Sequence, residues 1–236
     1  MSAGYLTLLS KLGKGTFHPG GFPFTKRVLA SYPPQEHTRI LDAGCGYGET
    51  SVYLASQYNC LVTGVDFQSA MIRAARRRNT LKEKRVSYRV ADITKLPFSS
   101  GSYDMVMTES VLCFVSLPQA LSELKRVLRP GGRLMAIESV LLKKMPDPLW
   151  EEFKHFYGFT SLYTAKGMKE ALRKAGFSTA FHTTLHPFRP ASTINPIASY
   201  ASFGVTEWNQ LIKNNDLLIK GAPYLGFTSF HARCPH

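Results

Sequence analysis

The sequence is poor in the features that mark secreted, metal-binding and membrane-spanning proteins. Only four of its 236 residues are cysteine, and Cys45, Cys60, Cys113 and Cys234 form no CxxC pair and no Cys/His pattern with zinc-ligand spacing. We therefore expect free thiols in a reducing compartment and no metal site. The chain has no run of about 18 apolar residues, and residues 1–17 lack a basic segment leading into a long apolar core. These absences predict a cytoplasmic protein without an integral membrane segment.

Acidic residues are also scarce. The chain carries 16 Asp and Glu against 29 Lys and Arg, for a net charge of +13. This charge favours acidic partners such as nucleic acid, anionic lipid or an anionic small molecule. Because net charge bears on solubility and association rather than on fold, a solvated basic surface is the simpler interpretation.

The sequence is rich in alternating segments of two periods. From residue 39 onward, short β-branched runs alternate with longer segments of helical period, the pattern of parallel strands joined by crossover helices. The length and a 44% hydrophobic content are sufficient for one domain with a full core. The strands are expected at 39–45, 61–66, 86–92, 103–109, 133–138, 178–184 and 225–234, and the helices at 49–58, 69–79, 117–128 and 164–177.

Capping and turn residues predict several boundaries. Ser69 stands where an N-cap would precede a helix, "RPGG" at 129–132 is expected to separate a helix from the next strand, and Gly176 is expected to end the last of these helices. The glycines and prolines of "GKGTFHPGGFPF" at 13–24 are typical of a flexible arm before the sheet.

We predict a single domain over residues 1–236 with four parts. Two long connections contain many aromatic residues and are longer than a simple link between elements needs. We expect both to cover a substrate pocket. The parts are an N-terminal helical or arm segment at 1–36, a core that binds a cofactor at 37–140, and covering insertions at 141–163 and 186–223.

The stretch "LDAGCGYGET" at 41–50 places three glycines directly after an apolar run. Glycine permits positive φ and the close approach of a ligand, and ligands of open α/β sheets lie at the carboxyl ends of the strands. A tight turn without a ligand is the alternative. Asp66 ends the next strand about twenty residues on, where a carboxylate can accept both hydroxyls of a ribose. Together these features favour a nucleoside-bearing ligand.

The spacing of the glycines argues against a dinucleotide. Gly44, Gly46 and Gly48 form G-x-G-x-G rather than G-x-G-x-x-G, and Glu49 follows in the first helical turn. A carboxylate there would repel a pyrophosphate but is compatible with a cationic sulfonium.

The motifs in their order resemble those of the class I S-adenosylmethionine-dependent methyltransferases. "ILDAGCGYGE", "VTGVDFQSAM", "VADITKLPFSSGSYDMV" and "ELKRVLRPGGRLMAIES" look like successive family motifs over 39–140. The series is most similar to the small-molecule group that includes ubiquinone/menaquinone and sterol methyltransferases. The resemblance implies a Rossmann-like α/β fold with a mostly parallel seven-stranded sheet, helices on both faces and an antiparallel last strand. It also implies S-adenosyl-L-methionine as cofactor.

The resemblance further implies roles for individual residues. Two of these residues also have a purely structural interpretation: Asp92 can cap the following turn, and Glu109 can be a helix-capping or buried structural acid. "TESVLCF" is not the Asn/Asp-Pro-Pro-Tyr box of many enzymes that methylate amino groups, so adenine-N6 or glutamine methylation is disfavoured. The implied cofactor contacts are Gly44, Cys45 and Gly46 beside the methionine portion, Asp42 ordering their turn, Asp66 on the ribose, Phe67, Asp92 and Ile93 around the adenine, and Glu109 near the methyl donor and acceptor.

No catalytic residue is assigned from sequence. An acceptor that loses a proton would need a base, and the candidates are His18, Glu109, His155, Tyr157 and His186. For each histidine, a surface or structural residue is the simpler interpretation.

The leading hypothesis is methyl transfer to a small molecule by in-line displacement, which needs mainly proximity and desolvation. One alternative is an RNA methyltransferase that uses the basic run at 73–85, and another is a protein that binds the cofactor without turnover. The acceptor atom and the oligomeric state stay open.

Overall fold

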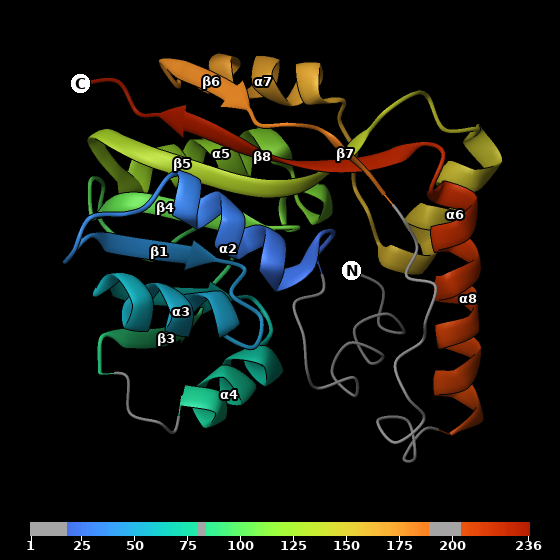
Figure 1. Ribbon diagram of the computed structural model, residues 1–236, viewed down its shortest axis with the longest axis horizontal. Helices are drawn as coiled ribbons and strands as arrows, with labels where there is room; N and C mark the ends of the chain where they lie inside the picture. Colours follow the sequence, from blue (N-terminus) through green and yellow to red (C-terminus); the bar gives the residue numbers. More distant parts are fainter. Residues whose placement is uncertain (1–17, 80–83, 189–203) are drawn as a thin grey trace.

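The computed structural model describes residues 18–79, 84–188 and 204–236. Within these ranges the chain forms one twisted sheet with helices packed against it (Figure 1). Its strand order is β3-β2-β1-β4-β5-β8-β6, and a short β7 pairs with β8. The strands are β1 (Arg39–Ala43), β2 (Leu61–Asp66), β3 (Val86–Val90), β4 (Tyr103–Glu109), β5 (Leu128–Leu141), β6 (Thr179–His182), β7 (His186–Pro187) and β8 (Leu225–Arg233).

Strand direction confirms the predicted fold class. β1 to β5 pair in parallel, whereas β8 is antiparallel to both β5 and β6. The last strand is therefore the antiparallel one, as expected. The described helices are α2 (Gly21–Ser31), α3 (Glu49–Tyr58), α4 (Ser69–Arg78), η2 (Leu112–Phe114, a 3-10 turn), α5 (Leu117–Val127), α6 (Asp147–Tyr157), α7 (Ala165–Lys174) and α8 (Val205–Gly221).

The central strands are apolar on both faces because helices cover both. Successive strand residues point to opposite faces. Ile40 of β1 packs with α2 and α3, whereas its neighbour Leu41 packs with α5 and α7. Met105 and Val106 of β4 divide in the same way. This two-sided burial fixes the register of the sheet and hence the positions at which its strands end.

A third apolar cluster lies beside the sheet, where α6 and α8 pack together at one end of the molecule (Figure 1). Phe153 and Tyr157 of α6 meet Leu217 of α8 in its buried centre. Both helices lie within the segments expected to cover a pocket.

Two predicted element boundaries were wrong. Ser69 is not an N-cap: it is the first residue of α4, Gln68 is the cap, and the Ser69 hydroxyl accepts a hydrogen bond from Arg73. "RPGG" is not a turn before the strand, because β5 already begins at Leu128, which pairs with Tyr103 across a register shift. The left-handed Gly131 (φ 72°) absorbs this irregularity.

The proposed flexible arm at 13–24 was wrong in its described part. His18 is buried, and α2 begins at Gly21 and buries Phe24. Residues 13–17 lie outside the described residues. Strand ends also differ: β1 stops at Ala43 because Gly44 is left-handed (φ 87°).

Candidate functional site

The carboxyl ends of β1, β2 and β4 open into one cavity of about 670 Å³. Its first part is lined by the glycine turn after β1, by Asp66 at the end of β2 and Phe67 after it, and by Asp92 and Ile93 after β3. Its second part is lined by residues of α6, α8, η2 and β8. Residues predicted from the strand ends are thus brought together in one place, and a second compartment adjoins them.

The glycine turn is shaped by two different constraints. Gly44 has φ of 87°, and a Cβ there would lie 2.2 Å from Val111 Cγ2. Gly46 has φ of 50°, but no atom of the described residues lies within 4 Å of the position its Cβ would take. Gly44 is therefore required by protein packing, whereas Gly46 leaves open space in the cavity wall.

The Asp66 carboxylate lies at the centre of the first part. Its two oxygens accept the backbone N–H of Gly46 (3.1 Å) and of Gln68 (2.9 Å). Burial raises its pKa, and these two hydrogen bonds oppose the rise. The hydrogen bonds orient the carboxylate, and each oxygen keeps a lone pair for a further donor.

The predicted adenine side is apolar with one carboxylate. Ile93 is buried and Phe67 is 55% exposed, which is unusual for so large an apolar ring. Asp92 Oδ1 accepts the backbone N–H and the hydroxyl of Thr94 (both 2.8 Å), so Asp92 does cap the following turn. It also lines the cavity.

Asp42 lies beneath the turn rather than in the cavity lining. Its buried carboxylate accepts a hydrogen bond from Ser51 of α3. Burial, followed by the nearby charge of Glu109, raises its pKa to about 7. Asp42 thus ties β1 to α3 behind the glycines. Cys45 does line the cavity, and burial raises the pKa of its thiol.

Glu109 is held by three side chains from two helices and a loop. Its Oε1 accepts from the Thr25 hydroxyl and lies 3.2 Å from His18 Nε2. Its Oε2 accepts from the Thr50 hydroxyl (2.6 Å). His18 Nδ1 lies 3.0 Å from the carbonyl oxygen of Pro19, so both ring nitrogens face oxygen atoms. His18 and Glu109, which the sequence suggests as two separate candidate bases, form one pair in the cavity wall.

Of the other three candidate bases, one lines the cavity and two do not. Tyr157 lines the second part of the cavity, and its hydroxyl bonds to Asn214 Oδ1 (3.0 Å). His155 is exposed on α6, and His186 stacks on Phe227 (ring centroids 5.3 Å apart). Neither of these histidines is among the described residues that line the cavity.

Sequence reasoning missed four residues of this site. Thr25 and Thr50 are ordinary helix residues in the sequence, and only their contacts with Glu109 reveal them. Ser110 has φ of 53° and a buried hydroxyl that has no hydrogen-bond partner among the described residues, and it lines the cavity. Glu138 accepts the N–H groups of Val111 and Leu112 and so fixes the turn after Ser110. The only signal for Glu138 was an acid inside an apolar strand.

A sheet of order 3-2-1-4-5-8-6 with a glycine turn after its first strand and an acid after its second defines the class I methyltransferase fold. Residues 41–136 match the family described as "Methyltransferase domain". The chain is similar to the uncharacterized methyltransferase YodH of Bacillus subtilis, with 38% identity over 203 residues that cover 82% of this chain and 87% of YodH. The chain therefore belongs to the methyltransferase-domain family and is an S-adenosylmethionine-dependent methyltransferase.

More distant similarities reach larger proteins. The chain is 32% identical to an O-methyltransferase of Pyrenophora dematioidea over 160 residues, which cover 65% of this chain and 59% of that protein. The structure of Haemonchus contortus phosphoethanolamine N-methyltransferase 2 in complex with S-adenosyl-L-methionine superimposes with a TM-score of 0.84 at 20% identity. That match covers 98% of this chain but 57% of the nematode protein, and it shows the fold alone. None of the described helices combines the length and the apolar character that a membrane crossing needs.

Proposed function

We propose that this methyltransferase methylates a small molecule held in the compartment formed by α6 and α8. The observation that carries the proposal is the continuity of the cavity, which runs from the glycine turn to an aromatic wall without a break. Phe153, Tyr157 and Phe159 form much of that wall, and their rings lie in mutual contact. Small-molecule sites are concave and mostly apolar with a few placed polar groups, and this compartment fits that description.

The cofactor would occupy the first part of the cavity. Gly46 offers the space for its methionine portion, the oriented Asp66 carboxylate suits the ribose hydroxyls, and Phe67 and Ile93 suit the two faces of the adenine. Asp92 retains oxygen lone pairs for the adenine amino group, and Asp42 acts only through the turn. A sulfonium is already a strong electrophile, so the protein needs mainly to align the acceptor and exclude water.

Calorimetry with S-adenosylmethionine and S-adenosylhomocysteine tests the cofactor site. Asp66→Ala removes charge-assisted hydrogen bonds, and we expect at least about a tenfold loss of affinity. Asp147→Ala is the matched control, because that carboxylate is 79% exposed at the start of α6. Equal binding by wild type and Asp66→Ala would contradict the assignment.

An assay with labelled S-adenosylmethionine and cell extract then tests the acceptor. We expect the label in products of small size. Label in RNA would support the RNA alternative, and tight cofactor binding without any labelled product would support a protein without turnover.

The basic helix offers limited support for RNA. Of its arginines, Arg76 donates to the carbonyl oxygen of Tyr88 and Arg78 pairs with Glu49. These arginines fix α4 to the sheet and to α3 rather than standing free for phosphate contacts. Likeness to the ubiquinone/menaquinone and sterol group and a cytoplasmic location both stay predictions.

A further inference from the structure

The cavity has a charge opposite to that of the whole molecule. Among its described lining residues are four carboxylates, Glu49, Asp66, Asp92 and Glu109, one histidine, and no lysine or arginine. Arg78, outside the lining, pairs with Glu49, and His18 lies beside Glu109, so Asp66 and Asp92 are the two of these acids without a basic partner among the described residues. This is a marked exclusion in a chain with 29 Lys and Arg. The carboxylates suit a sulfonium cation, and they oppose any anion brought into the same space.

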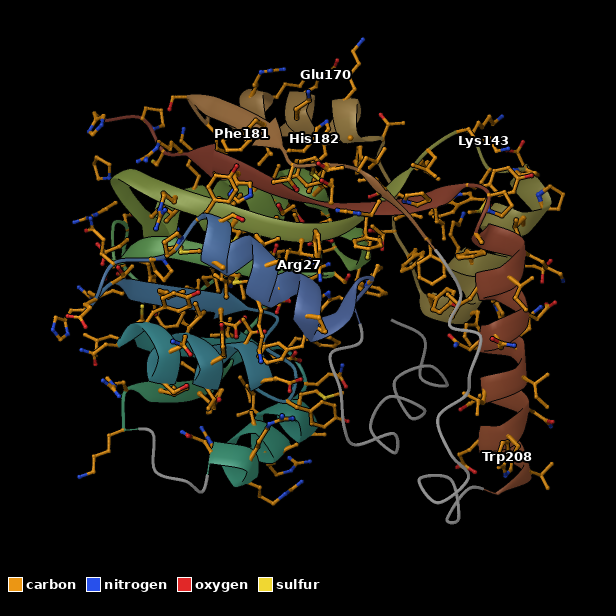
Figure 2. All side chains as sticks on the ribbon, in the orientation of Figure 1. Arg27, Lys143, Glu170, Phe181, His182 and Trp208 are labelled. Atoms are coloured by element: carbon orange, nitrogen blue, oxygen red, sulfur yellow. The ribbon has the colours of Figure 1, made fainter. Side chains whose placement is uncertain are left out.

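Basic residues of the covering helices are used elsewhere. Lys213 precedes the lining residue Asn214 in α8, but it pairs with Glu152 of α6. Lys220 pairs with Asp216 (2.8 Å), and all four of these charged side chains are about half exposed. Lys143, labelled in Figure 2 on the loop between β5 and α6, lies over the ring of Tyr224. None of these three lysines lines the cavity among the described residues.

The acceptor compartment itself is apolar. Phe114, Phe159 and Leu218 line it together with Phe153 and Tyr157. The rings of Tyr157 and Phe159 are stacked with centroids 5.1 Å apart. A phosphate buried against such a wall would lose its hydration and gain no cation from the described lining residues, which is strongly unfavourable.

Polar groups gather instead at the reacting end. Glu109, at the end of β4, presents a carboxylate that can only accept hydrogen bonds once ionised. The next residue, Ser110, brings a hydroxyl that no described group satisfies, although it is buried. A substrate hydroxyl both donates and accepts, so it fits this adjacent pair. A protonated amine would be attracted by Glu109 but has no lone pair with which to attack.

We infer that the acceptor is an uncharged, largely apolar compound whose reacting group is a hydroxyl, and that acceptors carrying a phosphate are rejected. This inference rests on the proposed function. The hydroxyl oxygen forms a bond to the methyl carbon while the carbon–sulfur bond breaks, and its electron pair goes to sulfur, leaving neutral S-adenosylhomocysteine. The hydroxyl proton passes to Glu109 and then to water.

Matched pairs of ligands test the charge rule directly. Binding of 2-naphthol and 2-naphthyl phosphate, and of catechol and catechol monophosphate, is measured by calorimetry on the full chain saturated with S-adenosylhomocysteine. We expect the uncharged member of each pair to bind and the phosphate to bind at least about tenfold more weakly. Equal or tighter binding of the phosphates overturns the inference, and so does binding of neither member. Failure to bind S-adenosylhomocysteine itself would instead overturn the proposed function.

A cation introduced into the wall of the acceptor compartment should reduce the expected discrimination against phosphates. Leu218→Arg introduces a positive charge into the compartment wall. We expect it to reduce the ratio of affinities between the uncharged ligand and the phosphate of each pair by about tenfold. Ile219→Arg makes the same change on the next residue, which is 56% exposed, and should leave this ratio unchanged. Asn214→Arg is the second cavity position if Leu218→Arg does not fold. If a folded cavity variant keeps the wild-type ratio of affinities within each pair, the proposed rejection of phosphates is contradicted.

The hydroxyl is tested with a methyl ether. In the wild type, 2-naphthol should bind more tightly than 2-methoxynaphthalene, which cannot donate a hydrogen bond. Both ligands can accept a hydrogen bond from Ser110, so Ser110→Ala should weaken the binding of both, whereas Ser178→Ala, at an exposed serine, should weaken neither. Equal binding of the two ligands by the wild type would overturn the assignment of a hydroxyl acceptor.

Discussion

Glu109, at the end of β4, is held by donors on both of its carboxylate oxygens. Donors from Thr25 and Thr50, together with His18, fix both oxygens of its carboxylate. Such support holds a negative charge at one position and limits its rearrangement during reaction. The arrangement is therefore suited to orient an acceptor and receive its proton.

Glu109→Gln should abolish this role while keeping the shape of the side chain. We expect methyl transfer to fall by about 10²-fold, the range that general bases contribute, with little change in thermal unfolding. Glu36→Gln, an exposed acid before β1, is the control. The measurement is kcat of the wild type and both variants with S-adenosylmethionine and a hydroxyl acceptor. An unchanged kcat in Glu109→Gln would show that Glu109 is a structural acid.

The residues of this site differ in how far sequence could predict them. Asp66 and Glu109 could be placed because the carboxyl ends of neighbouring parallel strands meet at one edge of a sheet. His18 and Thr25 could not be placed beside them. Both precede the first strand, and no sequence pattern near them predicts where α2 packs. Ser110 was missed for a similar reason: its positive φ arises from contacts of the next turn with Glu138.

Alanine substitutions at Gly44 and Gly46, the first two glycines of the turn, should have different effects on stability. Gly44→Ala forces a Cβ against Val111 and into a left-handed conformation, so we expect a loss of several kcal/mol in stability. The new Cβ of Gly46→Ala meets no atom in the described part of the chain, and its cost should be about 1 kcal/mol from φ alone. Urea unfolding and cofactor calorimetry separate the two. Gly46→Ala should fold yet bind S-adenosylmethionine weakly, and normal binding would mean that the ligand lies elsewhere.

The covering helices should affect the acceptor more than the cofactor. Leu217 of α8 is fully buried, and Leu217→Ala should loosen the packing of α8 at a cost of about 2–5 kcal/mol. We expect a raised KM for the acceptor and an unchanged Kd for S-adenosylhomocysteine. Ile212→Ala, at a position 65% exposed on the same helix, is the control. Equal losses of cofactor and acceptor binding would contradict a separate cover.

Elements of the sheet were easier to predict than those of the cover. β2 and α3 begin and end at the residues expected from the sequence, because period-2 and period-3.6 patterns are sharp where one face or both are buried. α8 was expected only as part of a covering insertion. Its burial is shallow and Ile212 and Ile219 remain exposed, so its apolar residues do not mark one buried face.

At the scale of the whole molecule, positive charge lies outside and carboxylates lie around the cavity. Two fully buried acids, Asp42 and Glu138, have pKa values raised to about 7, mainly by burial. Glu109 adds to both shifts by repulsion. The ligand-free protein therefore holds protons near neutral pH that an unfolded chain has released.

The contribution of these two acids to stability should consequently fall as pH rises from about 4 to about 7. In that range each acid binds more protons in the folded state than in the unfolded state, so its contribution to the free energy of unfolding decreases with pH and levels off above the folded pKa. His231, whose pKa burial lowers to about 4, contributes with the opposite sign over the same range, and it is common to all the variants compared. Asp42→Asn keeps an acceptor for Ser51 and removes one of the two titrations. We expect the difference between pH 5 and pH 8 to shrink by an amount on the order of 1–4 kcal/mol. Urea unfolding at both values measures it, with Asp147→Asn as the exposed control. Equal pH dependence in the wild type and Asp42→Asn would show that Asp42 is ionised in the folded protein.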